Sequence, residues 1–309
     1  MTATLKSSSH TYSLGNPMRW RDSDRSSNIE DRRDQQMASA GVPSALLLRL
    51  LPFLLRTKIG RVILLLGGLY FAFQYFTGGL SLEPSNQAGF SQSQSASNTA
   101  AQDENAQFVA AILGTTETVW NQLLQGRYVE PKLVLYRNMT STGCGMGQAQ
   151  SGPFYCPADS KVYIDLSFLE ELKKLGAPGD FAFAYVIAHE VGHHVQNLLG
   201  TSTKVRQAQQ AAGKAQANQL SVALELQADC YAGVWGHYVD RQLNLLEAGD
   251  VEEGIAAASA VGDDRLQKMA GRAVQPEAFT HGSSADRVKW FKTGFASGKL
   301  ASCNTFNRN

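Results

Sequence analysis

The sequence lacks acidic residues from Gln35 to Leu82, although the net charge of the whole 309-residue chain is only +1. So small a net charge gives no general attraction to nucleic acid, and no nucleic-acid partner is expected. The acid-free stretch contains the apolar run VILLLGGLYFAFQYFTGGL, residues 62–80. At about 1.5 Å per residue this run approaches the roughly 30 Å hydrocarbon core of a bilayer, which predicts one transmembrane helix. Four basic residues precede it: Arg49, Arg56, Lys58 and Arg61.

The apolar run also lacks a following small-x-small cleavage site, and its position far from the N-terminus argues against a cleaved signal peptide. Polar segments on both sides argue against a buried core helix. By the positive-inside rule, the basic cluster keeps residues 1–61 in the cytoplasm. The sequence therefore predicts a single-pass inner-membrane protein with an extracytoplasmic C-terminal domain. It leaves open whether LLLRLLPFLLR, residues 46–56, also enters the membrane.

Two segments are poor in the apolar residues that packing requires, and they divide the chain. Residues 1–41 are predicted to be a disordered cytoplasmic tail, and residues 81–103 a flexible linker. Residues 42–80 between them are the juxtamembrane segment and the transmembrane helix. The folded domain is expected over residues 104–309, with no internal repeat.

Hydrophobic spacing within this domain predicts an α+β fold that is mostly helical. Phe108, Ile112, Val119 and Leu123 recur at helical spacing, and residues 132–139 and 161–169 have the composition of strands. Capping residues then mark the starts of further helices. These helices are a short one opened by a Ser167–Glu170 capping box, one capped by Asp180 and ended by Gly200, a long one over 218–246, and two that begin near Asp250 and Ser283.

The four cysteines all follow the apolar run, and no two of them form a CxxC pair, which disfavours a Cys₄ zinc site. An even number in an exported domain predicts disulfides. Cys144 and Cys156 enclose a Gly- and Pro-containing loop whose ends could meet, which would leave Cys230 for Cys303. The sequence alone leaves all three pairings open.

The stretch AHEVGHHVQ, residues 188–196, contains an HExxH motif. His189 and His193 are four residues apart, so on a helix both imidazoles reach one cation. Glu190 lies beside them, where it can take a proton from zinc-bound water. His194 faces elsewhere on the helix and is expected to be a packing or surface histidine.

A catalytic zinc usually has three protein ligands, so the motif needs one more. The stretch ALELQADCYAGVW offers Glu225 and Asp229, again four residues apart on a predicted helix. Glu225 is the expected third ligand, and Asp229 the carboxylate that accepts a hydrogen bond from a ligating imidazole. The alternative is that both acids lie on a solvated helix face. His237 lies off that face and is expected to be structural.

These motifs, together with GPFYCPAD, VYIDLSF and FTHGSSADRVKWF, resemble the bacterial family of membrane-anchored neutral zinc metallopeptidases over about residues 130–295. The resemblance implies a zincin-like fold, one Zn²⁺ per chain and peptidase activity. HEVGH followed by ELQAD is similar to the gluzincin branch, in which a downstream Glu is the third ligand. THGSSADR is similar to the THPxxxxR segment of membrane-associated gluzincins, which implies that His281 and Arg287 lie near the metal. Here Gly282 stands in the place of the proline.

Together these features predict a membrane-anchored zinc endopeptidase that hydrolyses peptide bonds of extracytoplasmic proteins through Glu190-activated water. VYIDLSF is expected to supply an edge strand for the peptide substrate. His281 is expected to donate to the oxyanion or to cap the zinc, the alternative being a histidine at a helix entry. Two other functions stay open: a catalytically silent zinc-binding scaffold or chaperone in the membrane, and a cytoplasm-facing adaptor.

Overall fold

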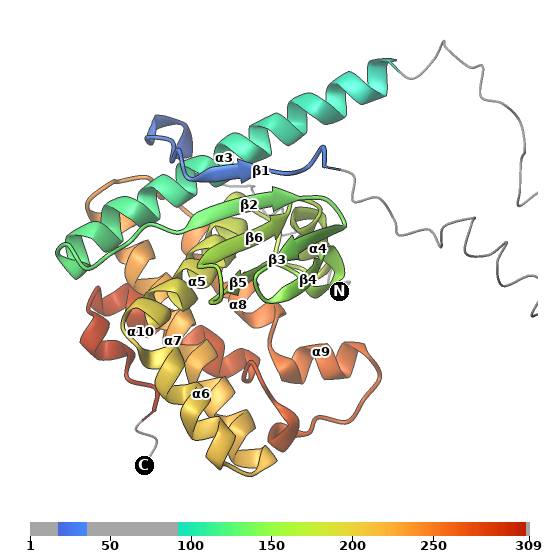
Figure 1. Ribbon diagram of the computed structural model, residues 1–309. Coiled ribbons are helices and arrows are strands. Elements are labelled where there is room, and N and C mark those ends of the chain that lie inside the picture. The colour runs from blue at the N-terminus through green and yellow to red at the C-terminus, as the bar shows by residue number, and fades with distance from the viewer. Residues whose placement is uncertain (1–17, 36–91, 307–309) are drawn as a thin grey trace, which may run out of the picture. The chain divides into compact units, whose positions relative to one another are not determined.

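The computed structural model describes residues 18–35 and 92–306, which form a mixed α and β structure that is mostly helical, as predicted (Figure 1). Of these residues, 18–35 and 101–306 belong to one compact unit. The predicted transmembrane helix over residues 62–80 and the segment 46–56 lie outside the described ranges. None of the helices within those ranges has a stretch long and apolar enough to cross a membrane.

A four-stranded sheet has the order β1-β2-β6-β5. The predicted strands are confirmed as β2 (Lys132–Tyr136) and β6 (Lys161–Asp165), which pair in parallel. β1 (Ile29–Asp31) adds to β2 in parallel, and β5 (Phe154–Cys156) adds to β6 antiparallel. A separate hairpin joins β3 (Met139–Thr142) to β4 (Gly145–Gln148).

The helices expected from spacing and capping residues are present, and two further helices, α6 and α9, were not predicted. α3 begins inside the segment predicted to be a flexible linker, so that prediction is wrong from Gln92 onward. The helices are α3 (Gln92–Leu124), α4 (Phe168–Lys174), α5 (Asp180–Leu198), α6 (Thr201–Ala211), α7 (Lys214–Arg241), α8 (Asp250–Ala260), α9 (Asp263–Met269) and α10 (Ser284–Ser297).

Two of the predicted caps are wrong in detail. Ser167 precedes α4 but its side chain makes no capping bond, and its own N–H donates to Asp165 Oδ1 at 2.9 Å. Asp180 is the first residue of α5 rather than its cap. The carboxylate of Glu253 on α8 accepts from the Phe181 N–H at 3.1 Å instead, so a tertiary contact replaces the local one. The Ser283 cap of α10 is confirmed, since its side chain accepts from the Asp286 N–H.

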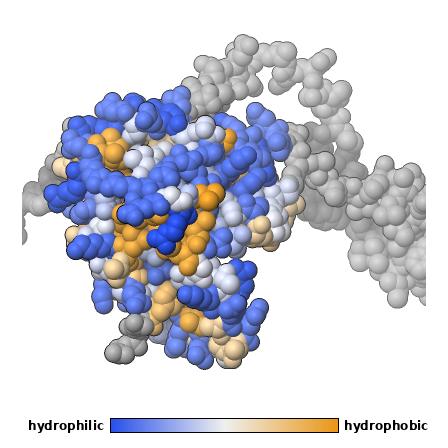
Figure 2. All heavy atoms as spheres, turned by 60° about the vertical axis from the view of Figure 1, so that its left-hand side comes forward, coloured by the Kyte–Doolittle hydropathy of each residue, from blue (hydrophilic) through white to orange (hydrophobic). Residues whose placement is uncertain are grey.

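Alternate residues of β2 and β6 form the two faces of the sheet. Leu133, Leu135, Val162 and Ile164 are fully buried and belong to the main core with α3, α5, α7, α8 and α10. Val134 and Tyr163 lie on the other face in a smaller cluster. The face seen in Figure 2 is mostly hydrophilic, with its apolar residues gathered mainly in one patch.

Disulfides join Cys144 to Cys156 and Cys230 to Cys303, the pairing that loop proximity suggested. The second one ties α7 to the C-terminal end of the chain, where close helix packing also occurs. A Cβ on Gly233 of α7 would lie 2.1 Å from the Phe291 carbonyl oxygen, and one on Gly294 of α10 only 1.9 Å from the Cys230 carbonyl oxygen. Because both positions are glycine, α7 and α10 lie backbone to backbone.

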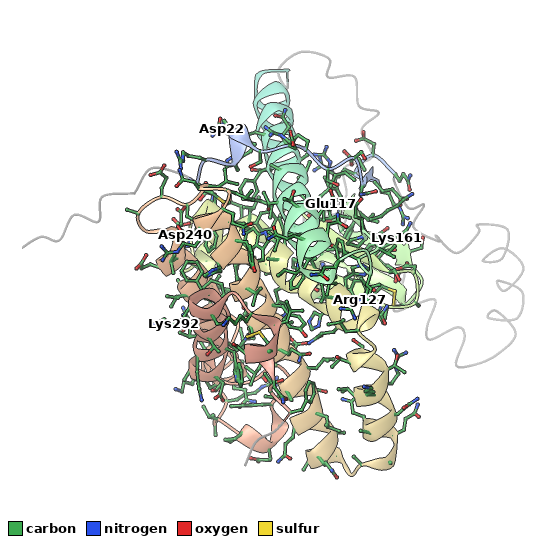
Figure 3. All side chains as sticks on the ribbon, turned by 90° about the vertical axis from the view of Figure 1, so that its left-hand side faces the viewer. Asp22, Glu117, Arg127, Lys161, Asp240 and Lys292 are labelled. Carbon is green, nitrogen blue, oxygen red and sulfur yellow. A yellow bond between two sulfur atoms is a disulfide. The ribbon has the colours of Figure 1, made fainter. Side chains whose placement is uncertain are left out.

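The prediction of a disordered tail over residues 1–41 is wrong for residues 18–35, which we call the N-terminal segment. Figure 3 shows this segment crossing α3. Trp20 is only 5% exposed and packs edge-on against Phe108, with ring centroids 5.4 Å apart. Composition failed here because two buried residues, Met18 and Trp20, and three strand residues hold a segment that is otherwise mostly polar.

We predict that Trp20→Ala lowers the free energy of unfolding by about 3–5 kcal/mol, because it removes a large aromatic side chain from the core. The measurement is the denaturant midpoint for unfolding of the purified full chain, with the dependence of the free energy of unfolding on denaturant concentration unchanged between variants. The control is Ser27→Ala, an exposed change in the same segment, which should alter stability by less than about 0.5 kcal/mol. Equal midpoints for the two variants would show that the segment is not part of the core.

Candidate metal centre

Two helices bring the three predicted metal ligands together. His189 and His193 lie one turn apart on α5, and Glu225 faces them from α7. Their ligand atoms lie within 4.8 Å of one another. Gly192, between the two histidines, permits this approach, because even a Cβ at that position would lie 3.1 Å from the Ala228 carbonyl oxygen. The solvated-face alternative for Glu225 is therefore wrong.

These atoms lie close enough together to share one cation, and each imidazole faces a different oxygen of the Glu225 carboxylate. Nε2 of His189 lies 3.3 Å from Oε2 of Glu225, and Nε2 of His193 lies 3.4 Å from Oε1. Ligand atoms about 2.0–2.1 Å from a tetrahedral Zn²⁺ lie about 3.3–3.4 Å from one another. Two imidazoles and a carboxylate are also a donor set that zinc commonly takes in catalytic sites.

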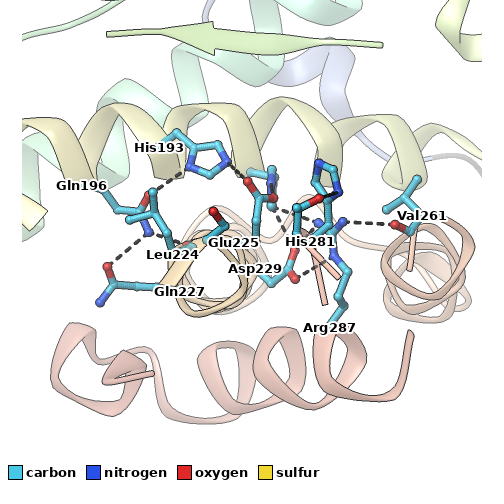
Figure 4. A network of polar contacts seen from close by, with 12 residues as sticks. His193, Gln196, Leu224, Glu225, Gln227, Asp229, Val261, His281 and Arg287 are labelled. Carbon is cyan, nitrogen blue, oxygen red and sulfur yellow. Dashed lines mark hydrogen bonds and ion pairs between the residues drawn. The ribbon is translucent and has the colours of Figure 1, made fainter. Parts of the chain in front are cut away.

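Both imidazoles use their other nitrogen in a contact that fixes the ring (Figure 4). His189 Nδ1 lies 2.8 Å from Asp229 Oδ1, the acceptor predicted from the sequence. His193 Nδ1 lies 2.9 Å from the side-chain oxygen of Gln196, which the sequence reasoning missed. The Gln196 amide in turn donates to the Leu224 carbonyl of α7 at 2.7 Å. These contacts leave both Nε2 atoms directed at Glu225.

Asp229 is fully buried and is neutralised by Arg287 of α10. The guanidinium makes two bonds to the carboxylate, from Nε to Oδ2 at 2.9 Å and from Nη2 to Oδ1 at 2.8 Å. The hydroxyl of Tyr185, another residue that sequence reasoning missed, also donates to Asp229. Arg287 therefore reaches the site as the sequence predicted, and its contact is with Asp229.

Opposite charges outweigh burial in setting the protonation of the two carboxylates. Desolvation raises the pKa of Glu225, but the imidazoles of His193 and His189 hold that pKa well below its usual value. Desolvation also raises the pKa of Asp229, and Arg287 and His189 lower it to about 2. Both carboxylates are thus ionised at neutral pH, as binding of a divalent cation requires.

The three ligand residues open into a cavity of about 700 Å³ that Glu190, His281 and Arg287 also line. Its walls include Phe154 and Tyr155 of β5. The prediction that VYIDLSF is an edge strand is wrong, because β6 pairs with β2 on one side and β5 on the other. Within the described residues, the strand at this edge of the sheet is β5.

His281 lies in the loop before α10, and Asp263 at the start of α9 holds that loop in place. Oδ2 of Asp263 accepts from the N–H groups of Thr280 and His281 at 2.7 Å and of Gly282 at 3.0 Å. Its Oδ1 lies 3.2 Å from His281 Nδ1. Gly282 has φ +99°, so glycine suits this position where the family segment has proline. Asp263, which sequence reasoning missed, is the residue that positions His281.

The remaining histidines of the motif region are structural, as expected. His194 is 1% exposed, with Nε2 2.6 Å from the Val129 carbonyl oxygen and Nδ1 3.1 Å from the Tyr155 hydroxyl. Burial lowers its pKa. His237 contacts the Phe295 carbonyl oxygen of α10 at 2.8 Å. Both rings hold neighbouring elements together and face away from Glu225.

A fixed pair of imidazoles, a facing carboxylate and an open cavity are typical of metal-dependent hydrolases. Residues 18–306 match the family model described as "Putative neutral zinc metallopeptidase", and the chain belongs to this family. The match begins at the first residue of the N-terminal segment.

Two relatives show how far this similarity extends. The uncharacterized protein YpfJ of Escherichia coli K12 is 51% identical over 300 residues, which cover 94% of this chain and all of YpfJ. The uncharacterized protein Rv2575 of Mycobacterium tuberculosis is 43% identical over 211 residues, 64% of this chain and 70% of Rv2575. No solved structure matches the chain significantly.

We predict that Gln196→Ala weakens zinc binding by about 10–100-fold, since His193 loses the acceptor that fixes its ring. The measurement is zinc affinity by competition with a chelator. Asn197→Ala is the matched control, because this neighbouring amide contacts Tyr155 and no predicted ligand. Glu225→Ala, which removes a predicted ligand, should bind still more weakly than Gln196→Ala. Full affinity in Glu225→Ala would exclude Glu225 from the metal site.

Proposed function

We propose that this protein is a zinc endopeptidase that cleaves peptide bonds of extracytoplasmic proteins. The observation that carries this proposal is the convergence of ligand atoms of His189, His193 and Glu225 within 4.8 Å of one another, beside Glu190 and at the wall of a cavity. A bound Zn²⁺ would polarise a water molecule and the scissile carbonyl group. Glu190, which lines the same cavity, would accept a proton from the attacking water and pass it to the leaving amine.

The substrate would lie along β5. This strand pairs with β6 on one side only, and its residues Phe154 and Tyr155 line the cavity that holds Glu190. An extended peptide could add to the other side of β5 through backbone hydrogen bonds, with its side chains against the cavity wall. In this mode of binding, the hydrogen bonds are made to the backbone of the substrate, so they depend little on its side chains. This suits a peptidase that acts on extended or unfolded chains.

We further propose a zincin-like fold and an oxidising compartment. The zincin-like proposal is supported by a sheet packed against α5, the helix that has the two histidines, and by a second helix with the carboxylate. The compartment is supported by the disulfides Cys144–Cys156 and Cys230–Cys303, since disulfides persist outside the cytosol. Both disulfides also argue against a cytoplasm-facing adaptor.

A catalytically silent scaffold is the alternative, and the donor set argues against it. A structural zinc site usually closes with four protein ligands. Among residues 18–35 and 92–306, the candidate metal-binding group that contains His189 consists of three residues, and it faces a cavity. A scaffold would also have no use for a carboxylate at position 190.

Glu190→Gln is expected to lower the rate of peptide hydrolysis by at least about 100-fold, because an amide does not accept the proton. Zinc content, measured by elemental analysis, should stay at the wild-type value because Glu190 is not a proposed ligand. Glu170→Gln, the same chemical change on the exposed surface of α4, is the matched control. Unchanged hydrolysis in Glu190→Gln would contradict the role of Glu190 and favour the scaffold.

The pH dependence of the rate tests His281. Its contact with Asp263 raises the pKa of His281 although burial opposes this. With Nδ1–H donated to Asp263, the Nε2 atom donates to an oxyanion only in the protonated ring. Activity should therefore fall as pH rises through this raised pKa. Asp263→Asn removes the charge that raises it, so we expect the alkaline limb of kcat to move to lower pH.

His281→Ala supplies the matching control for this experiment. It should lower kcat, keep zinc bound and abolish any further effect of Asp263→Asn on the alkaline limb. A pH profile of Asp263→Asn that superimposes on that of the wild type would show that His281 does not act in its protonated form.

A further inference from the structure

Three parts of the domain hold the N-terminal segment: α3, the loop after α7 and strand β2. The Trp20 ring lies in the core against Phe108 of α3. The Arg19 N–H donates to the Leu245 carbonyl after α7 at 2.8 Å, and the Ser26 N–H donates to the Ala110 carbonyl of α3 at 3.0 Å. The segment is thus fixed by side-chain burial and by backbone hydrogen bonds.

Strand β1 completes this attachment through the sheet. The Leu133 N–H of β2 donates to the Asn28 carbonyl at 2.8 Å, and the Arg32 N–H donates to the Leu135 carbonyl at 2.7 Å. The carboxylate of Glu30 lies 2.8 Å from Lys161 Nζ of β6, which extends the contact by one more strand. Without β1, the backbone groups of β2 along this edge would lose their partners.

The surface of α3 is shaped to receive the segment. A Cβ on Gly114 would lie 2.7 Å from the Asp24 carbonyl oxygen, so no larger residue fits there without a shift. Ser26 is 8% exposed, and its hydroxyl donates to Glu117 of α3 at 2.6 Å. Such close fit indicates that the segment folds together with the domain.

These contacts constrain how the chain meets the membrane. Residues 36–91 connect the segment to the domain, and they include the run 62–80 that predicts a transmembrane helix. A single crossing there would place residues 18–35 and 104–306 on opposite faces of the bilayer, where β1 could not pair with β2. We propose that residues 18–35 and 104–306 lie on the same side of the membrane, so that the connecting chain crosses it zero or two times. The inference does not depend on the peptidase function.

This arrangement is compatible with the charge distribution that suggested a single crossing. Lys58 and Arg61 lie between two apolar runs of the sequence, residues 46–56 and 62–80, and Arg56 ends the first run. With two crossings, these basic residues would lie on the cytoplasmic side, as the positive-inside rule favours. The first crossing would then need residues beyond 46–56, because eleven residues span only about 16 Å as a helix. The N-terminal segment is then free to be exported with the domain.

The test compares one new thiol in the segment with one in the domain. Ser27→Cys and Gln122→Cys place thiols at exposed positions of the segment and of α3, and the native cysteines are all in disulfides. Full-length protein in cells with a permeabilised outer membrane is treated with a membrane-impermeant maleimide. A permeant maleimide after lysis gives the total reactive thiol, and a cytoplasmic thiol protein reports on leakage.

We expect equal labelled fractions at the two positions. Equal labelling supports the inference together with the extracytoplasmic location. Equal protection also supports the inference, but it places both parts in the cytoplasm and contradicts that location. Labelling of one position and protection of the other overturns the inference. Asp34→Cys, at a second exposed position of the segment, guards against local misfolding of the first variant and should give the same fraction.

Discussion

The buried ion pair between Asp229 and Arg287 is the interaction on which the candidate metal centre depends. Removing either partner would leave an uncompensated charge in the interior, which typically costs about 3–5 kcal/mol. The pair does more than cancel charge, because the same carboxylate that accepts from Arg287 also orients the ring of His189. The position of α10 is thus coupled to the direction in which a ligand nitrogen on α5 points.

Close packing of helices makes this coupling rigid. Gly192 brings α5 against α7, and Gly233 with Gly294 brings α7 against α10. The Cys230–Cys303 disulfide then links α7 to the end of the chain, and Gln227 donates to the Cys303 carbonyl at 3.0 Å. A path of direct contacts therefore runs from the ligand His193 through Gln196 and Gln227 to the C-terminal end of the described chain. Such support is what a site with ligands on separate helices requires.

The part of the site that lies on one helix could be predicted from sequence, because helical spacing fixes which side chains share a face. His189 with His193, and Glu225 with Asp229, were found in this way. Gln196 and Tyr185 were within reach of the same argument, being three residues after one ligand and four before the other. Asp263 could not be found by this argument. It holds a loop 18 residues later, and no helical spacing relates the two positions. The family resemblance, rather than spacing, placed Arg287.

Helices and strands could be predicted where apolar residues recur at regular spacing over a long segment. Strand β1 shows why other elements could not. Its three residues, IED, have no apolar period, and their stability comes from pairing with a strand about one hundred residues later. Composition therefore assigned the segment to a disordered tail. A tail assigned in this way is also free to lie on the other side of a membrane, whereas the pairing of β1 with β2 supports the proposal that both parts lie on the same side.

The order β1, α3, β2 supports the same-side proposal in structural terms. Parallel strands need a crossover connection, and here α3 is the helix of that connection, packed in the same core as Leu133 and Leu135 of β2. Residues 36–91 are then an insertion between the first strand of a β-α-β unit and its helix. Lengthening such a connection costs little, since the closure entropy grows only with the logarithm of its length. A long insertion at this point can therefore be accommodated without disturbing the unit.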